Sequence, residues 1–218
     1  MENIEPKLDI QETFLKSFAD PLKDTSELML DELLEDGSVL EKINGISLVV
    51  SAVKFTNKIA AKRFAKRLYH FIHSVHTNAP LDDWMKKFKD RLSSDQKTQA
   101  KTIEQILEWL EGFPADIHSK ILSKLFISFV EGSLSYERFI RLGTAIQNIN
   151  PYGFAIIEPI LKNTGYDQPD KNERISYLAG SGLLLHESSG TFGGGSFPEI
   201  TELGKELFEY GLKDLELP

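Results

Sequence analysis

The 218-residue sequence contains no cysteine. Disulfide bonds and thiol catalysis are therefore excluded, and because the absence fits a reducing compartment we expect a cytoplasmic protein. Long apolar runs are lacking as well. The longest charge-free apolar stretch, residues 43–53, is about half of the roughly 20 residues that a membrane-spanning helix needs. Residues 1–5 also lack the basic and apolar regions of a secretory signal peptide, so no such leader is expected.

Positive charge is scarce except in one segment. The chain has 25 Lys and Arg residues against 33 Asp and Glu residues. Residues 47–92 contain ten basic and three acidic residues, whereas residues 1–46 contain four and twelve, and residues 151–218 contain five and eleven. This segregation gives an acidic protein a local cationic region where an anionic partner can dock, but it does not name the partner.

Helical periodicity runs through the first 163 residues. Apolar residues recur every three or four positions in successive segments, and the period-two alternation that would predict strands is absent. Residues suited to cap these helices stand between the apolar segments: Thr56 or Asn57, Gly132, Ser135 and Asn150. We therefore predict an all-helical domain over residues 1–163, arranged as a multi-helix bundle.

The pattern changes after residue 163. Residues 165–170 contain Gly, Pro and two acids and predict a loop. The segments expected after it are a helix over 173–183, short strands over 183–187 and 197–200, and a helix over 201–212 capped by Thr201. The sequences LAGSGLL at 178–184 and ITELGKEL at 200–207 resemble the end of a winged-helix domain. That resemblance implies a small winged-helix-like module with a two-stranded β-hairpin over residues 171–218, in a chain that is mainly α.

The winged-helix resemblance also implies a way to bind DNA. In DNA-binding members the third helix enters the major groove, which in this chain would place four residues near the bases: Lys171, Arg174, Ser176 and Tyr177. The charge argues against that role, because five basic and eleven acidic residues give segment 151–218 a net charge of −6. Phosphate neutralisation supplies most non-specific affinity for DNA, so a structural or protein-docking wing is favoured.

Two helical segments carry a further resemblance. The sequences KILSKLF at 120–126 and EGSLSYERF at 131–139 resemble small bacterial proteins of the tellurite-resistance TerB-like type and uncharacterised helical proteins from phage-defence neighbourhoods. The resemblance implies a non-enzymatic role in a stress or antiviral defence system. It also implies metal binding in the TerB case, although no ligand position of this chain matches.

The cationic segment predicts an amphipathic helix. At about 100° per residue, most of its Lys and Arg side chains lie opposite an apolar stripe that includes Val53, Phe64, Leu68 and Phe71. The predicted anion-binding or partner-binding set is Lys54, Phe55, Lys58, Ile59, Lys62, Arg63, Lys66 and Arg67. One interpretation is an ordinary solvated face, in solvent or paired with the acidic N-terminal segment. The other is a docking surface for nucleic acid or anionic lipid, in which Phe55 and Ile59 stack on bases or insert into lipid.

Catalytic and metal-binding patterns fail on inspection. Histidines 70, 73 and 76 are three residues apart and spread over about 120° of a helix, whereas the zinc pattern places two histidines four residues apart on one face. Glu104, Glu108 and Glu111 share a helix face as paired catalytic carboxylates would, but apolar residues lie opposite and predict a solvated face. No catalytic residue, metal or cofactor is expected, and the chain is not expected to be an enzyme.

These patterns favour a non-enzymatic cytoplasmic adaptor or regulatory protein that acts through protein–protein contacts. One alternative is a winged-helix DNA-binding transcriptional regulator. A second is a peripheral membrane effector that uses the basic amphipathic helix. A protein, a nucleic acid and an anionic membrane surface are thus the partner classes, and the oligomeric state is left open.

Overall fold

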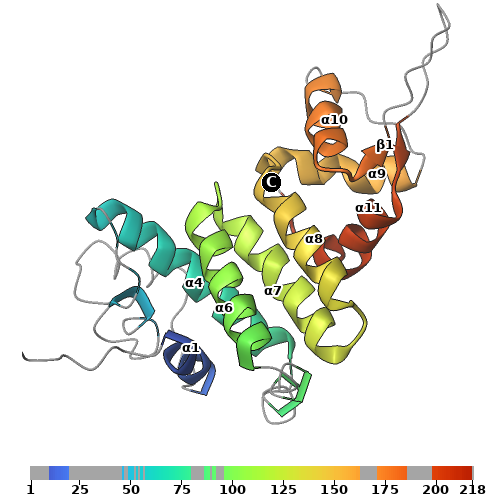
Figure 1. Cartoon of the computed structure of the whole chain (residues 1–218). Coiled ribbons are helices and arrows are strands. Elements are labelled where there is room, and N and C mark those ends of the chain that lie inside the picture. The colour runs from blue at the N-terminus through green and yellow to red at the C-terminus, as the bar shows by residue number, and fades with distance from the viewer. Residues whose placement is uncertain are drawn as a thin grey trace, which may run out of the picture. The chain divides into compact units, whose positions relative to one another are not determined.

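The structure is a computed structural model that describes residues 10–19, 46, 49–51, 53, 55, 57–79, 86–88, 90, 91, 96–162, 171–185 and 198–217. Helices make up most of these residues, and one two-stranded antiparallel sheet joins them (Figure 1). The predicted fold class, mainly α with a small β-hairpin, is confirmed. The chain divides into two compact units, Met1–Gly112 and Phe113–Pro218.

The division between the units differs from the predicted domain boundary between residues 163 and 171. Its physical cause is the packing of α7 (Asp116–Glu131) and α8 (Tyr136–Gln147), which contact each other and the C-terminal helices. The approach is close: a Cβ atom added at Gly211 would lie 3.1 Å from the Ile121 side chain on α7. Helices assigned from periodicity to the first domain therefore share a core with the C-terminal module.

The N-terminal unit contains α1 (Ile10–Ala19), α4 (Lys58–Asn78) and α6 (Gln96–Gly112), which pack pairwise against one another. Its core contains aromatic side chains from two of these helices. The rings of Phe14 and Phe18 lie 5.1 Å apart, and the ring of Phe18 meets that of Phe71 edge-on at 6.0 Å. Edge-to-face contacts of this kind add to the free energy of apolar burial, so α1 is held against α4 by its phenylalanines.

The C-terminal unit contains the other elements. They are α7, α8, the 3₁₀ helix η1 (Pro151–Ile156), α9 (Ile157–Leu161), α10 (Lys171–Gly180), β1 (Leu184–Leu185), β2 (Glu199–Ile200), α11 (Glu202–Leu207) and the π-helical segment η2 (Phe208–Leu212). Four predicted caps are confirmed. Gly132 is left-handed, with φ 91°, and the side chains of Ser135, Asn150 and Thr201 accept hydrogen bonds from backbone N–H groups of the helices that follow them.

The hairpin pairs Leu184 with Ile200 and Leu185 with Glu199. Its register is held by Thr201, whose hydroxyl donates to backbone carbonyls of residues 182 and 183 and accepts from the N–H of residue 204. Helix α11 lies so close that a Cβ at Gly204 would be 2.4 Å from the Leu183 carbonyl oxygen. Only glycine allows this approach of helix and hairpin. The predicted connection over residues 188–196 lies outside the described residues.

Candidate binding surfaces

The exposed side of α4 is the clearest basic surface in the part of the chain that the structure describes. Asn57 accepts a hydrogen bond from the N–H of Ala60 at 2.9 Å and sets the start of the helix, so of the two predicted capping residues, Thr56 or Asn57, the cap is Asn57. The side chains of Phe64, Leu68 and Phe71 are buried on the inner side. The outward side carries Ile59, Lys62, Arg63 and Lys66, at positions i, i+3, i+4 and i+7, where helical side chains share one face.

The members of the predicted set differ in exposure. Ile59 is 65% exposed, the largest value for any large hydrophobic residue of the described chain, and Lys58 and Arg63 are exposed as well. Lys62 and Lys66 are half-buried. Within the described residues, Lys58, Lys62 and Arg63 take part in no ion pair or hydrogen bond, whereas Lys66 has other contacts. The side chain of Lys54 lies outside the described residues.

Arg67 corrects the predicted set. It is only 9% exposed, and its Nη1 atom donates to the carbonyl oxygens of Leu110 at 3.3 Å and Glu111 at 2.8 Å. These are last-turn carbonyls of α6, which have no intrahelical partner and stand at the negative end of the helix dipole. The guanidinium therefore caps α6 and is not part of an outward basic face.

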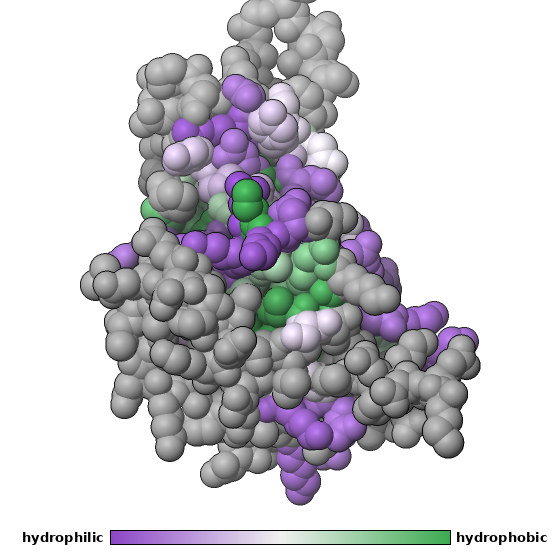
Figure 2. All heavy atoms as spheres, turned by 90° about the vertical axis from the view of Figure 1, so that its left-hand side faces the viewer, coloured by the Kyte–Doolittle hydropathy of each residue, from purple (hydrophilic) through white to green (hydrophobic). Residues whose placement is uncertain are grey.

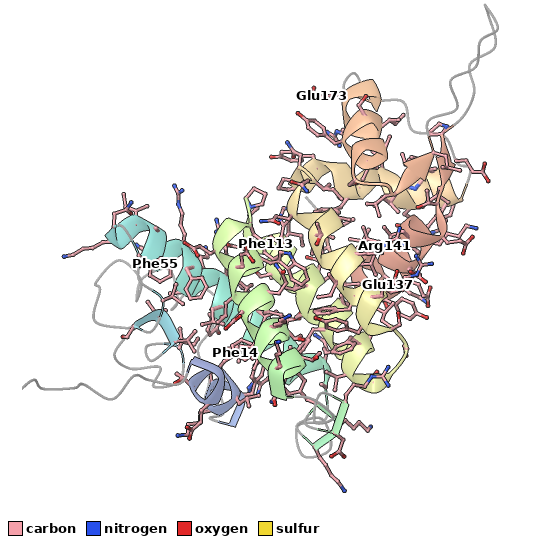
Figure 3. The ribbon with its side chains drawn as sticks, in the orientation of Figure 1. Phe14, Phe55, Phe113, Glu137, Arg141 and Glu173 are labelled. Carbon is pink, nitrogen blue, oxygen red and sulfur yellow. The ribbon has the colours of Figure 1, made fainter. Side chains whose placement is uncertain are left out.

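Phe55 also differs from its predicted place on the basic face. Its side chain is half-buried, and its ring lies 5.0 Å from the ring of Phe64, which belongs to the core side of α4 (Figure 3). The helix begins at Lys58, so the helical phase used for the prediction does not extend back to residue 55. Ile59 remains the exposed apolar residue of this surface.

A second surface lies on η1 and α10 of the C-terminal unit. The Nη1 atom of Arg174 donates to the carbonyl oxygen of Tyr152 at 2.9 Å, and the guanidinium carbon lies 5.7 Å from the centre of the Tyr152 ring. Tyr152 is 55% exposed, and Tyr177, one turn beyond Arg174 on α10, is 46% exposed. We call these three residues the tyrosine–arginine surface. Glu173, labelled in Figure 3, directly precedes Arg174 on α10.

The four residues predicted to read DNA are thus not a free basic row. Arg174 is bound to Tyr152, Ser176 and Tyr177 are exposed, and the side chain of Lys171 lies outside the described residues. The neighbouring exposed charge includes Glu173. Sequence reasoning did not find the contact between Tyr152 and Arg174, because the two residues are 22 positions apart and belong to different elements.

No family model, curated protein or solved structure matches the chain. Among the residues that the structure describes, no group of three or more His, Asp or Glu side chains is placed to hold a metal ion. Nor is any described helix long and apolar enough to cross a membrane.

The three histidines of α4 have separate surroundings. His70 is 6% exposed, and His73 is exposed with its ring stacked on Tyr69 at 5.5 Å. His76 stacks on Phe18 at 6.3 Å, and its Nε2 atom is buried without a hydrogen-bond partner. Burial lowers the pKa of His76 below its usual value, and the charge of His73 lowers this pKa further. These surroundings are those of packing residues.

A buried histidine outside the predicted set belongs to the core. His118 is fully buried between Phe113 and Phe154, with ring centres 5.3 and 5.2 Å away. Its two ring nitrogens lie 3.1 Å from the Ala115 carbonyl oxygen and 2.8 Å from the Ile149 carbonyl oxygen. The residue joins the start of α7 to the end of α8, and both its nitrogens face the protein and not a ligand.

Proposed function

We propose that this protein is a non-enzymatic adaptor or regulatory protein that binds a protein partner through the tyrosine–arginine surface. The observation that carries the proposal is the exposure of Tyr152 and Tyr177 near an arginine that is already held in place: Arg174 is bound to Tyr152 and is one turn before Tyr177 on α10. Tyr and Arg dominate the binding energy of protein interfaces, and a side chain fixed before binding loses little conformational entropy.

The chemistry of this surface favours a protein over DNA. A DNA-reading helix needs Lys and Arg side chains for phosphates and base edges, but Arg174 is engaged with Tyr152 and Glu173 lies beside it. The segment 151–218 has a net charge of −6 from five basic and eleven acidic residues, so phosphates are repelled. The hydroxyl and ring of an exposed tyrosine serve both polar and apolar groups of a polypeptide.

The setting of the proposed adaptor rests on resemblance. The likeness of residues 171–218 to the end of a winged-helix domain supports a docking module built on α10, the hairpin and α11. The likeness of residues 120–139 to helical proteins of stress and phage-defence systems supports a bacterial defence role in the cytoplasm. Within this proposal the winged module contributes a rigid frame for partner contacts.

The test begins with cross-linking of the full chain in its native cells, followed by identification of the cross-linked polypeptide and a binding titration with that purified partner. The double variant Tyr152→Ala/Tyr177→Ala should weaken binding by about 30-fold or more, since one interface hot spot is worth about 2 kcal/mol. Tyr136→Ala is the matched control, because Tyr136 is a 39% exposed tyrosine of the same unit. The affinity of the Tyr136→Ala variant for the partner should stay within two-fold of the wild-type affinity, because a surface substitution outside the interface has little effect.

Two outcomes would overturn the proposal. In one, the double variant and the Tyr136→Ala control bind the partner equally well. In the other, the protein binds duplex DNA with a steep dependence on salt concentration and loses this binding on Arg174→Glu, which is the behaviour of a DNA-binding regulator.

A further inference from the structure

The exposed side of α4 has the chemistry of a membrane contact. We propose that Lys58, Ile59, Lys62 and Arg63, called the α4 lipid face below, bind the surface of a membrane that contains anionic phospholipid. The face belongs to the N-terminal unit and shares no residue with the tyrosine–arginine surface, so the two proposals stand or fall separately.

The residues of the α4 lipid face lie close together around the helix. Ile59, Lys62 and Arg63 lie within about 100° of the circumference of α4, and Lys58 directly precedes Ile59 in the chain. The opposite side of the same turns is fixed in the core by Phe64 and Leu68. The cations and the isoleucine are therefore presented together on a helix whose orientation in its unit is set by packing.

The charge of the α4 lipid face favours an anionic surface. Lys58, Lys62 and Arg63 have no ion pair or hydrogen bond within the described residues, and the first turn of α4 contains no acidic residue. Cations at a helix N-terminus add to the positive end of the helix dipole and are not compensated by it. The arrangement concentrates positive potential at the start of α4, in a chain whose net charge is −8. A negatively charged surface would lower the repulsion among these cations.

The α4 lipid face also contains an exposed apolar residue. Ile59 is 65% exposed between the three cations. Figure 2 looks onto this end of α4 and shows hydrophobic atoms bordered by hydrophilic side chains. An aliphatic side chain held among Lys and Arg matches the boundary between headgroups and acyl chains, where the cations meet phosphate and the aliphatic group enters the hydrocarbon.

Nucleic acid fits this face less well. Single strands are held by bases stacked on aromatic side chains, but the aromatic residue of the predicted set, Phe55, is half-buried with its ring against Phe64. Ile59 offers no ring for stacking. A lipid surface needs only apolar insertion and cationic contact, and both are present.

A protein partner also fits this face less well. Protein interfaces are depleted in Lys and enriched in aromatic residues and Arg, and two of the three cations here are lysines. Residues typical of a protein interface occur instead at Tyr152 and Tyr177.

The experiment is co-sedimentation of the full chain with phosphatidylcholine vesicles that contain or lack phosphatidylglycerol. We expect binding only to the anionic vesicles and a loss of binding as salt is raised, because headgroup contacts are screened. Lys62→Ala/Arg63→Ala should reduce the vesicle affinity about five-fold for each cation removed. Ile59→Asn, which keeps every charge, should weaken binding and make the remainder more sensitive to salt.

The matched control is Lys101→Ala/Arg141→Ala, which removes the same charge from two exposed cations elsewhere and should leave binding within two-fold. Lys62 is half-buried and the other substituted residues are exposed, so circular dichroism should show unchanged folding. The proposal is overturned by equal binding to neutral vesicles, by an equal loss in the control variant, or by absence of vesicle binding. It is also overturned if the same face binds oligonucleotide or polyglutamate more tightly than anionic vesicles at equal ionic strength.

Discussion

The exposed side of α4 in the N-terminal unit carries cations around an isoleucine, whereas η1 and α10 in the C-terminal unit carry tyrosines around an arginine. The difference lies in what surrounds each cation. Arg63 finds no carbonyl or ring within the described residues, while Arg174 binds the Tyr152 carbonyl and covers its ring. The same residue type is therefore left exposed in one unit and is held by a carbonyl and a ring in the other.

One cation in each unit binds backbone carbonyls at the end of a helical segment. Arg67 caps the last carbonyls of α6, and Lys124 of α7 donates to the carbonyl oxygen of Lys213, just after η2. Burial lowers the pKa of Lys124, while the neighbouring Asp214 opposes this shift. In each case a cation meets the negative end of a helical segment, so cations with a structural role can be separated from cations left for a partner.

The largest expected effect tests whether the C-terminal unit is one cooperative core. Gly204→Ala places a Cβ 2.4 Å from the Leu183 carbonyl oxygen and 2.6 Å from the Ile200 side chain, so helix and hairpin must separate. We expect a loss of about 3 kcal/mol or more in unfolding free energy, measured by urea denaturation.

Gly180→Ala is the control for this substitution, because no atom lies within 4 Å of the added Cβ. It should be neutral or stabilise the protein by about 0.5 kcal/mol through the unfolded chain. Equal destabilisation by both substitutions would contradict the close packing of α11 on the hairpin.

The next effect separates the two kinds of cation on one helix. Arg67→Ala removes two hydrogen bonds from the end of α6 and should cost about 3 kcal/mol in unfolding free energy. Arg63→Ala, one turn earlier and exposed, should change it by less than about 0.5 kcal/mol. Urea denaturation measures both unfolding free energies. Equal losses of unfolding free energy in the two variants would contradict a structural role that Arg67 has and Arg63 lacks.

A smaller effect concerns the ring beneath Arg174. Tyr152→Leu keeps the backbone carbonyl that Arg174 binds but removes the aromatic face, and should cost about 0.5–1 kcal/mol. Tyr177→Leu removes an exposed ring that makes no such contact with the described part of the chain, and it should cost less. Thermal unfolding of both variants measures the difference, and a larger loss for Tyr177→Leu would show that the arginine is not held by the ring.

The smallest effect is a dependence on pH. The pKa of His76 is lower in the folded protein than the usual histidine value of 6.5, so the unfolded chain binds a proton at this residue more readily. The free energy of unfolding should therefore fall as the pH drops through 6.5. His76→Phe keeps the contact with Phe18, removes a buried nitrogen without a partner, and should flatten this part of the pH profile. A profile that stays as steep in the variant would assign the dependence to other groups.

Local features were predictable from the sequence, because capping and periodicity act over a few residues. The helix starts at Asn57 and Ser135 and the left-handed Gly132 are examples. The roles of Arg67 and Arg174 were not predictable, since each depends on a carbonyl that the chain brings close only through tertiary packing. Arg67 has an angular position near the edge of the apolar stripe, which is the one local signal of its burial.

The predicted domain boundary illustrates the same limit. Composition changes sharply near residue 163, but α7 and α8 are amphipathic and do not reveal from their own sequences which helices cover them. The close approach of Gly211 to α7 decides their unit, and a lone glycine near the C-terminus gives no signal of its distant neighbour.

Hydrogen–deuterium exchange of the full chain with and without phosphatidylglycerol vesicles tests the central claim, that the two units present surfaces of different chemistry. The account predicts added protection at the start of α4, around Lys58 to Arg63, and unchanged exchange at η1 and α10. Protection at Tyr152 and Tyr177, or protection spread equally over both units, would contradict it.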